Sequence, residues 1–133
     1  MQASPTNTAA VTQILLVEDN AELNELLEML LEQEGYQVTS VRDGEAAVRL
    51  LATGHYAVLL TDMQLPDMRG DALIRQLRAA GIRCRTVLMS AHIDVNARAA
   101  ACGADDYFVK GDPFRQLLHA VRLPAGGEGD SQP

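Results

Sequence analysis

The chain has 133 residues, of which 47% are hydrophobic, and this length and composition suit one folded domain with a buried core rather than a disordered chain. A formal net charge of −7 with no offsetting basic stretch argues against direct binding to nucleic acid. There is no apolar run long enough to span a bilayer and no secretory signal, so we expect a cytoplasmic protein without membrane contact. Cys84 and Cys102 have no CxxC partner, so we expect neither a disulfide nor a thiolate metal site.

The middle of the chain alternates between two kinds of segment, and both ends differ from it. Residues 1–12 are small and polar and residues 124–133 are rich in Gly, Ser, Pro and acid, so we predict disordered tails around one domain at residues 13–123. Within that domain, β-branched or leucine-rich runs alternate with segments of helical periodicity. The pattern predicts five strands, each followed by a helix: 14–17 and 20–33, 37–41 and 44–52, 56–61 and 70–80, 86–90 and 94–102, 105–109 and 113–123.

The helices have start and stop features besides their periodicity. The first helix carries five leucines on one face, which we expect to be buried: Leu23, Leu26, Leu27, Leu30 and Leu31. Glycines follow four of the helical stretches, where a left-handed C-terminal residue is favoured: Gly35, Gly54, Gly81 and Gly103. Asp112 and Pro113 are expected to be the N-cap and first residue of the last helix.

The strand sequences indicate the fold class. Residues 14–17 and 56–60 are apolar at nearly every position, which is typical of strands buried on both faces of a parallel sheet. The alternation with helices therefore predicts an α/β, doubly wound fold. Such sheets bind ligands beyond the carboxyl ends of their strands, so functional residues are expected there.

Five polar side chains lie at the carboxyl ends of predicted strands. Glu18 and Asp19 come after the first strand, Asp62 after the third and Lys110 after the fifth, and Ser90 ends the fourth. Each has an ordinary explanation by itself, as a helix-capping acid, a strand-exit acid, a turn serine or a solvated lysine. Three carboxylates at one edge of a sheet would repel one another unless a cation lay between them. We therefore predict that Mg²⁺ binds between these carboxylates together with a phosphate-like ligand.

These positions fall within motifs that resemble the response-regulator receiver domain, over roughly residues 13–123. The matching stretches are Ile-Leu-Leu-Val-Glu-Asp-Asn at 14–20, Asp-Gly at 43–44, Leu-Leu-Thr-Asp-Met-Gln-Leu-Pro-Asp-Met-Arg-Gly at 59–70, Met-Ser-Ala at 89–91 and Gly-Ala-Asp-Asp-Tyr-Phe-Val-Lys at 103–110. The resemblance implies a flavodoxin-like receiver fold with five parallel strands in the order 2-1-3-4-5.

The resemblance also implies roles for individual residues. Asp62 would accept a phosphoryl group, Lys110 would neutralise its charge and Ser90 would donate its hydroxyl to a phosphoryl oxygen. Tyr107 would change rotamer together with Ser90 as part of a switch. The implied Mg²⁺ ligands are Glu18, Asp19, Asp62 and the backbone carbonyl of Gln64.

The implied partners are those of a signalling protein rather than the substrates of an enzyme. The phosphoryl donor would be a sensor histidine kinase or a histidine phosphotransfer protein, and the chain's own chemistry would be Mg²⁺-dependent self-phosphorylation and slow autodephosphorylation. An output domain or protein would bind the face formed by the fourth helix, fifth strand and fifth helix. The resemblance also allows dimerisation on phosphorylation.

The sequence departs from the family pattern after the lysine. Many receivers have proline directly after it, whereas here Lys110 is followed by Gly111, Asp112 and Pro113. A cis bond before glycine would be costly, so we expect a trans bond, with Gly111 using a positive φ to turn into the last helix.

Three other functions share part of these features. A Mg²⁺-dependent phosphohydrolase with an aspartyl nucleophile usually has a second acid two residues later, where Gln64 stands here, and a lid that this chain has no insertion to form. A flavodoxin-like flavin carrier would suffer repulsion between Glu18–Asp19 and the flavin phosphate. A degenerate receiver that only docks proteins is disfavoured because all five site residues are present.

Overall fold

The structure is a computed structural model that describes residues 11–124. Its strands are β1 (Gln13–Val17), β2 (Gln37–Val41), β3 (Val58–Asp62), β4 (Arg85–Ser90) and β5 (Asp106–Val109). Its helices are α2 (Ala21–Gln33), α3 (Gly44–Thr53), α4 (Gly70–Ala79), α5 (Val95–Cys102) and α6 (Phe114–Val121). None of these helices is long and apolar enough to cross a membrane. The predicted tails, 1–12 and 124–133, lie outside the described residues except at Val11, Thr12 and Pro124.

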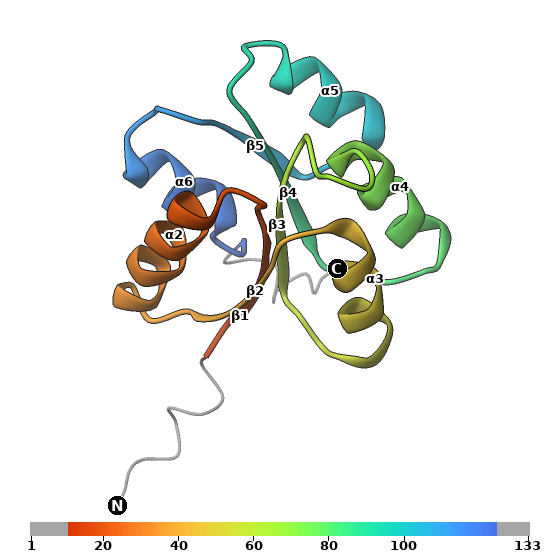
Figure 1. Ribbon diagram of the computed structural model, residues 1–133, viewed down its shortest axis with the longest axis horizontal. Coiled ribbons are helices and arrows are strands. Elements are labelled where there is room, and N and C mark those ends of the chain that lie inside the picture. The colour runs from red at the N-terminus through yellow and green to blue at the C-terminus, as the bar shows by residue number, and fades with distance from the viewer. Residues whose placement is uncertain (1–10, 125–133) are drawn as a thin grey trace, which may run out of the picture.

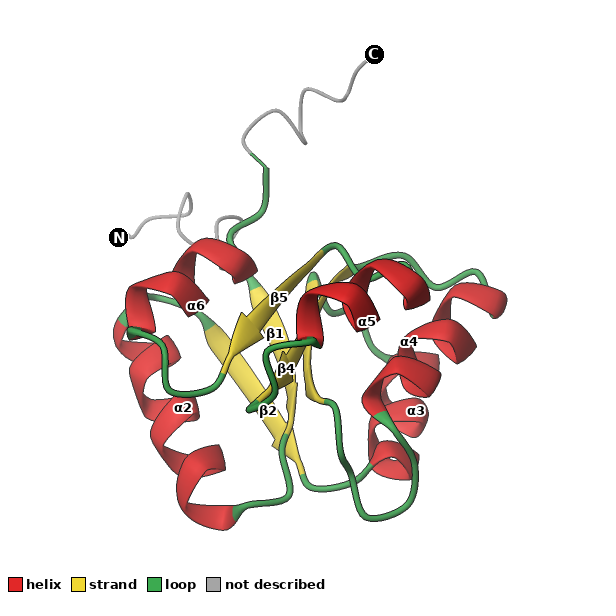
Figure 2. Ribbon diagram, turned by 90° about the horizontal axis from the view of Figure 1, so that it is seen from above, coloured by secondary structure: helices red, strands yellow, loops and turns green. Residues whose placement is uncertain are grey.

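The five strands form one parallel sheet in the order β2-β1-β3-β4-β5. Helices α2 and α6 cover one face, and α3, α4 and α5 cover the other (Figures 1 and 2). The doubly wound α/β fold and the strand order expected from the resemblance are both confirmed. Because all strands run the same way, their carboxyl ends meet at one edge of the sheet, and the residues that follow them are brought together there.

The core consists of two clusters, one on each face of the sheet. Along β1, Leu15 and Val17 pack toward α3, α4 and α5, whereas Ile14 and Leu16 pack toward α2 and α6. All four side chains are fully buried. Successive strand residues point to opposite faces, so a strand covered by helices on both sides must be apolar throughout, as the sequence predicted.

The leucine face of α2 is only partly buried, which corrects the sequence-based expectation. Leu27 and Leu31 are buried, but Leu26 is 46% exposed, and Asn24 rather than a leucine is the third buried residue of the helix. The helix contacts the sheet along the narrow stripe of residues 24, 27 and 31. The leucines beside that stripe instead line a small apolar groove shared with Phe108 and Phe114.

Two predicted helix ends are wrong in detail. Gly35, Gly81 and Gly103 have the positive φ expected of them, but Gly54 has φ −111° because the chain leaves α3 in an extended conformation toward β3. The N-cap of α6 is Pro113 and no side chain caps the helix, so the predicted capping role of the preceding aspartate is not observed.

Candidate functional site

Four of the predicted site residues meet at the carboxyl edge of the sheet. Glu18 follows β1 directly, Asp62 is the last residue of β3, Ser90 is the last residue of β4, and Lys110 follows β5. Glu18, Asp62 and Ser90 are buried, with 1%, 7% and 4% of their surface exposed. Three polar side chains are thus held below the surface at one end of the sheet, where burial requires compensating partners.

Lys110 supplies the positive charge for the two buried carboxylates. Its Nζ lies 2.9 Å from Glu18 Oε1 and 3.0 Å from Asp62 Oδ1. Burial alone would lower the pKa of Lys110, but the adjacent carboxylates of Glu18 and Asp62 outweigh it and raise the pKa above its usual value. The ammonium group is therefore held in its charged form between the two acids.

Asp19 brings a third carboxylate to the same place. One carboxylate oxygen from each of Glu18, Asp19 and Asp62 lies within 4.8 Å of the others. Glu18 Oε2 accepts a hydrogen bond from the Asn20 N–H at 3.0 Å. The buried Glu18 Oε1 forms the ion pair with Lys110, and no other described residue donates a hydrogen bond to it.

This arrangement fits a hard divalent cation. Mg²⁺ takes oxygen ligands, usually one or two carboxylates together with waters and phosphate oxygens. Three converging carboxylates offer such ligands. One lysine leaves an excess of negative charge in the cluster, which a divalent ion would offset.

The loop between β1 and α2 is fixed by two asparagines. The Asn20 side chain accepts a hydrogen bond from Leu23 N–H at 2.9 Å and so caps α2. The buried Asn24 side chain donates to the backbone carbonyls of Glu18, at 2.9 Å, and Val41, at 3.3 Å. Sequence analysis missed Asn24, although a polar residue within a stripe of leucines was a detectable sign of its role.

Ser90 already has a partner in its own loop. Its Oγ accepts a hydrogen bond from the His92 N–H at 3.1 Å, and its backbone carbonyl accepts one from the Lys110 N–H at 2.8 Å. Tyr107 pairs with Leu88 across β4 and β5, and its side chain is 37% exposed. The structure therefore places Tyr107 on the adjacent strand but outside the cluster of charged groups.

Two further sequence expectations concern loops at this edge. Gln64 lies in the exposed loop after Asp62, where it forms an isolated antiparallel bridge with Arg69. Among residues 11–124 there is no cis peptide bond, and Gly111 has φ 99°, as expected from the Gly-Asp-Pro sequence that follows Lys110.

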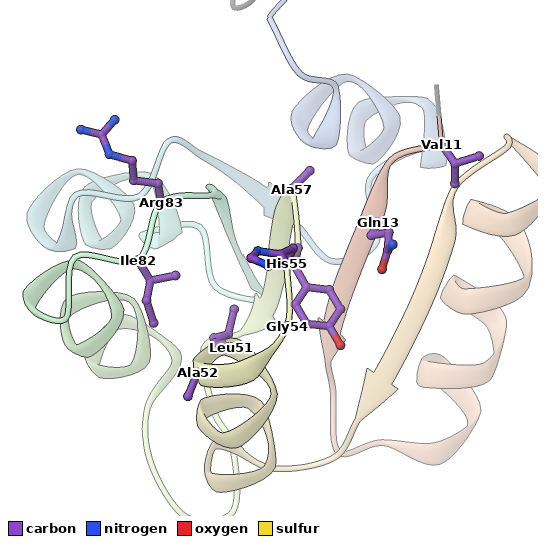
Figure 3. Close-up of a pocket in the computed structure, with 10 residues that line it drawn as sticks. Val11, Gln13, Leu51, Ala52, Gly54, His55, Ala57, Ile82 and Arg83 are labelled. Carbon is purple, nitrogen blue, oxygen red and sulfur yellow. The ribbon is translucent and has the colours of Figure 1, made fainter. Parts of the chain in front are cut away.

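A separate depression of about 560 Å³ lies at the opposite end of the strands (Figure 3). Its lining includes Gln13 at the start of β1, His55 and Ala57 before β3, and Arg83 before β4. No residue of the acidic cluster lines it. Its position at the amino ends of the strands separates it from the charged groups described above.

Comparison with known proteins places the chain in one family. The model of the response regulator receiver domain matches residues 14–122. The cell cycle transcriptional regulator CtrA of Caulobacter vibrioides is 34% identical over 126 residues, which are 90% of this chain and 54% of that protein. The sensory transduction protein RegX3 of Mycobacterium tuberculosis is 33% identical over 125 residues, covering 92% of this chain and 55% of that protein. The chain thus spans about half the length of these curated relatives.

Solved structures agree with the family assignment. The response regulator protein TrrA of Thermotoga maritima, in complex with Mg²⁺-BeF, is 27% identical with a TM-score of 0.77, covering 83% of this chain and 96% of that one. A signal receiver domain of a histidine kinase from Syntrophus aciditrophicus is 33% identical with a TM-score of 0.75, covering 83% of this chain and 86% of that one. This chain belongs to the response regulator receiver domain family and is a receiver domain of two-component signalling.

Proposed function

We propose that Asp62 is the phosphoryl acceptor and that a sensor histidine kinase or a histidine phosphotransfer protein is the donor. The observation that carries this proposal is the pairing of a buried aspartate at the end of β3 with Lys110, beside two further carboxylates. The other acids do not suit the role as well. Glu18 is 1% exposed, and its Oε2 already accepts a hydrogen bond from the Asn20 N–H. Asp19 forms no ion pair with Lys110.

The transfer requires positioning and charge neutralisation more than covalent chemistry by other groups. A carboxylate oxygen of Asp62 forms a bond to phosphorus, the bond between phosphorus and the donor imidazole nitrogen breaks, and the imidazole leaves. The Lys110 ammonium lies next to the acceptor oxygen and offsets the negative charge of the phosphoryl oxygens. Bound Mg²⁺, held by Asp19, Asp62 and the Gln64 carbonyl with Glu18 beside them, would supply further neutralisation of that charge.

The same proposal includes a switch. The Ser90 Oγ accepts a hydrogen bond from the His92 N–H, which leaves the hydroxyl proton available to donate to a phosphoryl oxygen once the loop adjusts to bring the two together. The partly exposed Tyr107 side chain would change rotamer with that adjustment. Such a rotamer change would alter the surface formed by α5, β5 and α6. An output domain or a second copy would bind that surface. The strength of this coupling is the difference between the two conformations in the free energy of phosphorylation.

Phosphoryl transfer from acetyl phosphate tests the acceptor role. We expect intact-mass spectrometry to detect one added phosphoryl group on the wild type, dependent on Mg²⁺, and none on Asp62→Asn, which keeps the shape of the side chain. Asp112→Asn, an exposed acid after Lys110, is the matched control and should be phosphorylated like the wild type. Absence of labelling on the wild type, where a known receiver is labelled, would contradict the proposal.

A further inference from the structure

The loop of residues 63–69, between β3 and α4, carries the proposed Mg²⁺ ligand Gln64 and is fixed at both ends by backbone hydrogen bonds. The Met63 N–H donates to the Met89 carbonyl at 2.7 Å, and the Gly70 N–H donates to the Met63 carbonyl, also at 2.7 Å. Gln64 itself is exposed. Inside the loop the Leu65 N–H donates to the Met68 carbonyl at 3.1 Å, so residues 65–68 form a compact turn whose placement is set by its contacts with the rest of the domain.

Asp67 makes that contact, and it does so with both carboxylate oxygens. Its Oδ1 accepts a hydrogen bond from the Gly44 N–H at 2.8 Å, and its Oδ2 accepts one from the Glu45 N–H at 2.9 Å. These are the first two amides of α3, which have no acceptor within the helix. The third amide, of Ala46, donates to the side chain of the helix's own N-cap, Asp43, at 2.8 Å. All three free amides are thus satisfied, two of them by a residue from another loop.

The contact between Asp67 and the start of α3 is of a strong type, although it lies at the surface. A carboxylate at a helix N-terminus gains from charge-assisted hydrogen bonds and from the helix dipole. The Gly44 amide, followed by that of Glu45, holds the pKa of Asp67 below its ordinary value despite partial desolvation. The neighbouring Met68 packs over Gly44, where a Cβ would lie 2.5 Å from the methionine Cγ. Polar and apolar contacts therefore join the same two segments.

Helix α3 is a firm anchor for this loop. Its Ala47 and Leu51 side chains are buried in the core cluster between the helix and the sheet. Asp43 already supplies the ordinary N-cap, so capping of the helix does not require a second acid from a distant loop. The bonds from Asp67 instead add a fixed point to the loop, three residues after Gln64.

We propose that Asp67 is a positioning residue for Mg²⁺ binding, which holds the loop that carries the Gln64 carbonyl by tying it to the N-terminus of α3. The inference rests on the proposed Mg²⁺-dependent function. Without this contact the loop samples other conformations, and the apparent dissociation constant rises in inverse proportion to the fraction of molecules that remain competent.

Magnesium affinity of the intact chain, measured by calorimetric titration with MgCl₂ and no phosphoryl donor, tests the proposal. We expect Asp67→Ala to raise the dissociation constant about 3- to 10-fold, as for a competent fraction of about 0.1–0.3. Asp67→Asn, which keeps one acceptor oxygen, should lie between this variant and the wild type. Asp43→Ala is the matched control, because it removes the same charge from the same helix end but leaves the loop contact, and it should change the constant less than about twofold.

Thermal unfolding and amide hydrogen exchange separate positioning from simple stabilisation. Both alanine variants should lower the melting temperature, but only Asp67→Ala should speed exchange at Gly44 and Glu45 and weaken Mg²⁺ binding. Equal Mg²⁺ affinity in Asp67→Ala and wild type, or equal weakening by Asp43→Ala, would overturn the positioning role alone. Lack of Mg²⁺ binding by the wild type would overturn the proposed function together with it.

Discussion

Replacing Lys110 by methionine tests the electrostatics of the site most directly. The change keeps an unbranched side chain only one atom shorter, and it removes the charge that lies 2.9 Å from Glu18 and 3.0 Å from Asp62. Removing one partner of a buried ion pair costs about 3–5 kcal/mol, because the remaining charge stays buried without compensation. Lys110 is 24% exposed, so water can replace part of its effect. We therefore expect a loss of about 2–4 kcal/mol in the free energy of unfolding without Mg²⁺.

Magnesium should reverse part of this loss. In the wild type the ion must share the carboxylates of Glu18 and Asp62 with an ammonium group, whereas in Lys110→Met they are free to bind it. We expect Mg²⁺ to bind the variant about tenfold more tightly, so a saturating concentration adds about 1.4 kcal/mol more stability to the variant than to the wild type. Phosphorylation by acetyl phosphate should nevertheless fall, because the ammonium no longer offsets the phosphoryl charge.

Urea unfolding followed by circular dichroism, with and without 10 mM MgCl₂, measures both effects. Lys110→Arg is the matched control, since it retains the charge and should retain most of the stability of the apo protein. A wild type that gains as much stability from Mg²⁺ as Lys110→Met would refute the reasoning, because the ion and the ammonium would then not compete for the same carboxylates.

Two further predictions concern the start of α4. Asp71 has a pKa held below its usual value chiefly by its hydrogen bonds with Arg69. Its contribution to stability is therefore present above the pKa of the unfolded chain and lost as pH falls through the lower folded value. Urea unfolding should show Asp71→Asn about 1 kcal/mol less stable than wild type at pH 7, a modest value because Arg69 is half-exposed. The difference should narrow as pH falls below about 4, and a difference that stays the same at every acidic pH would contradict this. Gly70→Ala should lower stability by about 1–3 kcal/mol and slow phosphorylation, because its Cβ would collide with the backbone carbonyl of Asp62. Gly44→Ala, which meets only a flexible methionine side chain, should cost less in thermal unfolding, and an equal cost would refute the argument.

The sequence by itself determined the architecture and the position of most candidate site residues. Apolar runs that alternate with helical periodicity are local features, and they were sufficient to predict a parallel sheet covered on both faces. Glu18, Asp62, Ser90 and Lys110 could be placed at one edge because a residue that ends or directly follows a parallel strand lies at the carboxyl edge of the sheet. Only residues adjacent to strands benefit from this rule.

The tertiary structure decided which of those groups touch and what else supports them. The rotation of α2 on the sheet buried Asn24 and left Leu26 exposed, which the periodicity of five leucines did not distinguish. The contact of Asp67 with the start of α3 joins residues more than 20 positions apart, through two loops that carry no periodic pattern. Helix rotation and the approach of separate loops depend on packing among all the elements at once, so no local pattern in the chain encodes them.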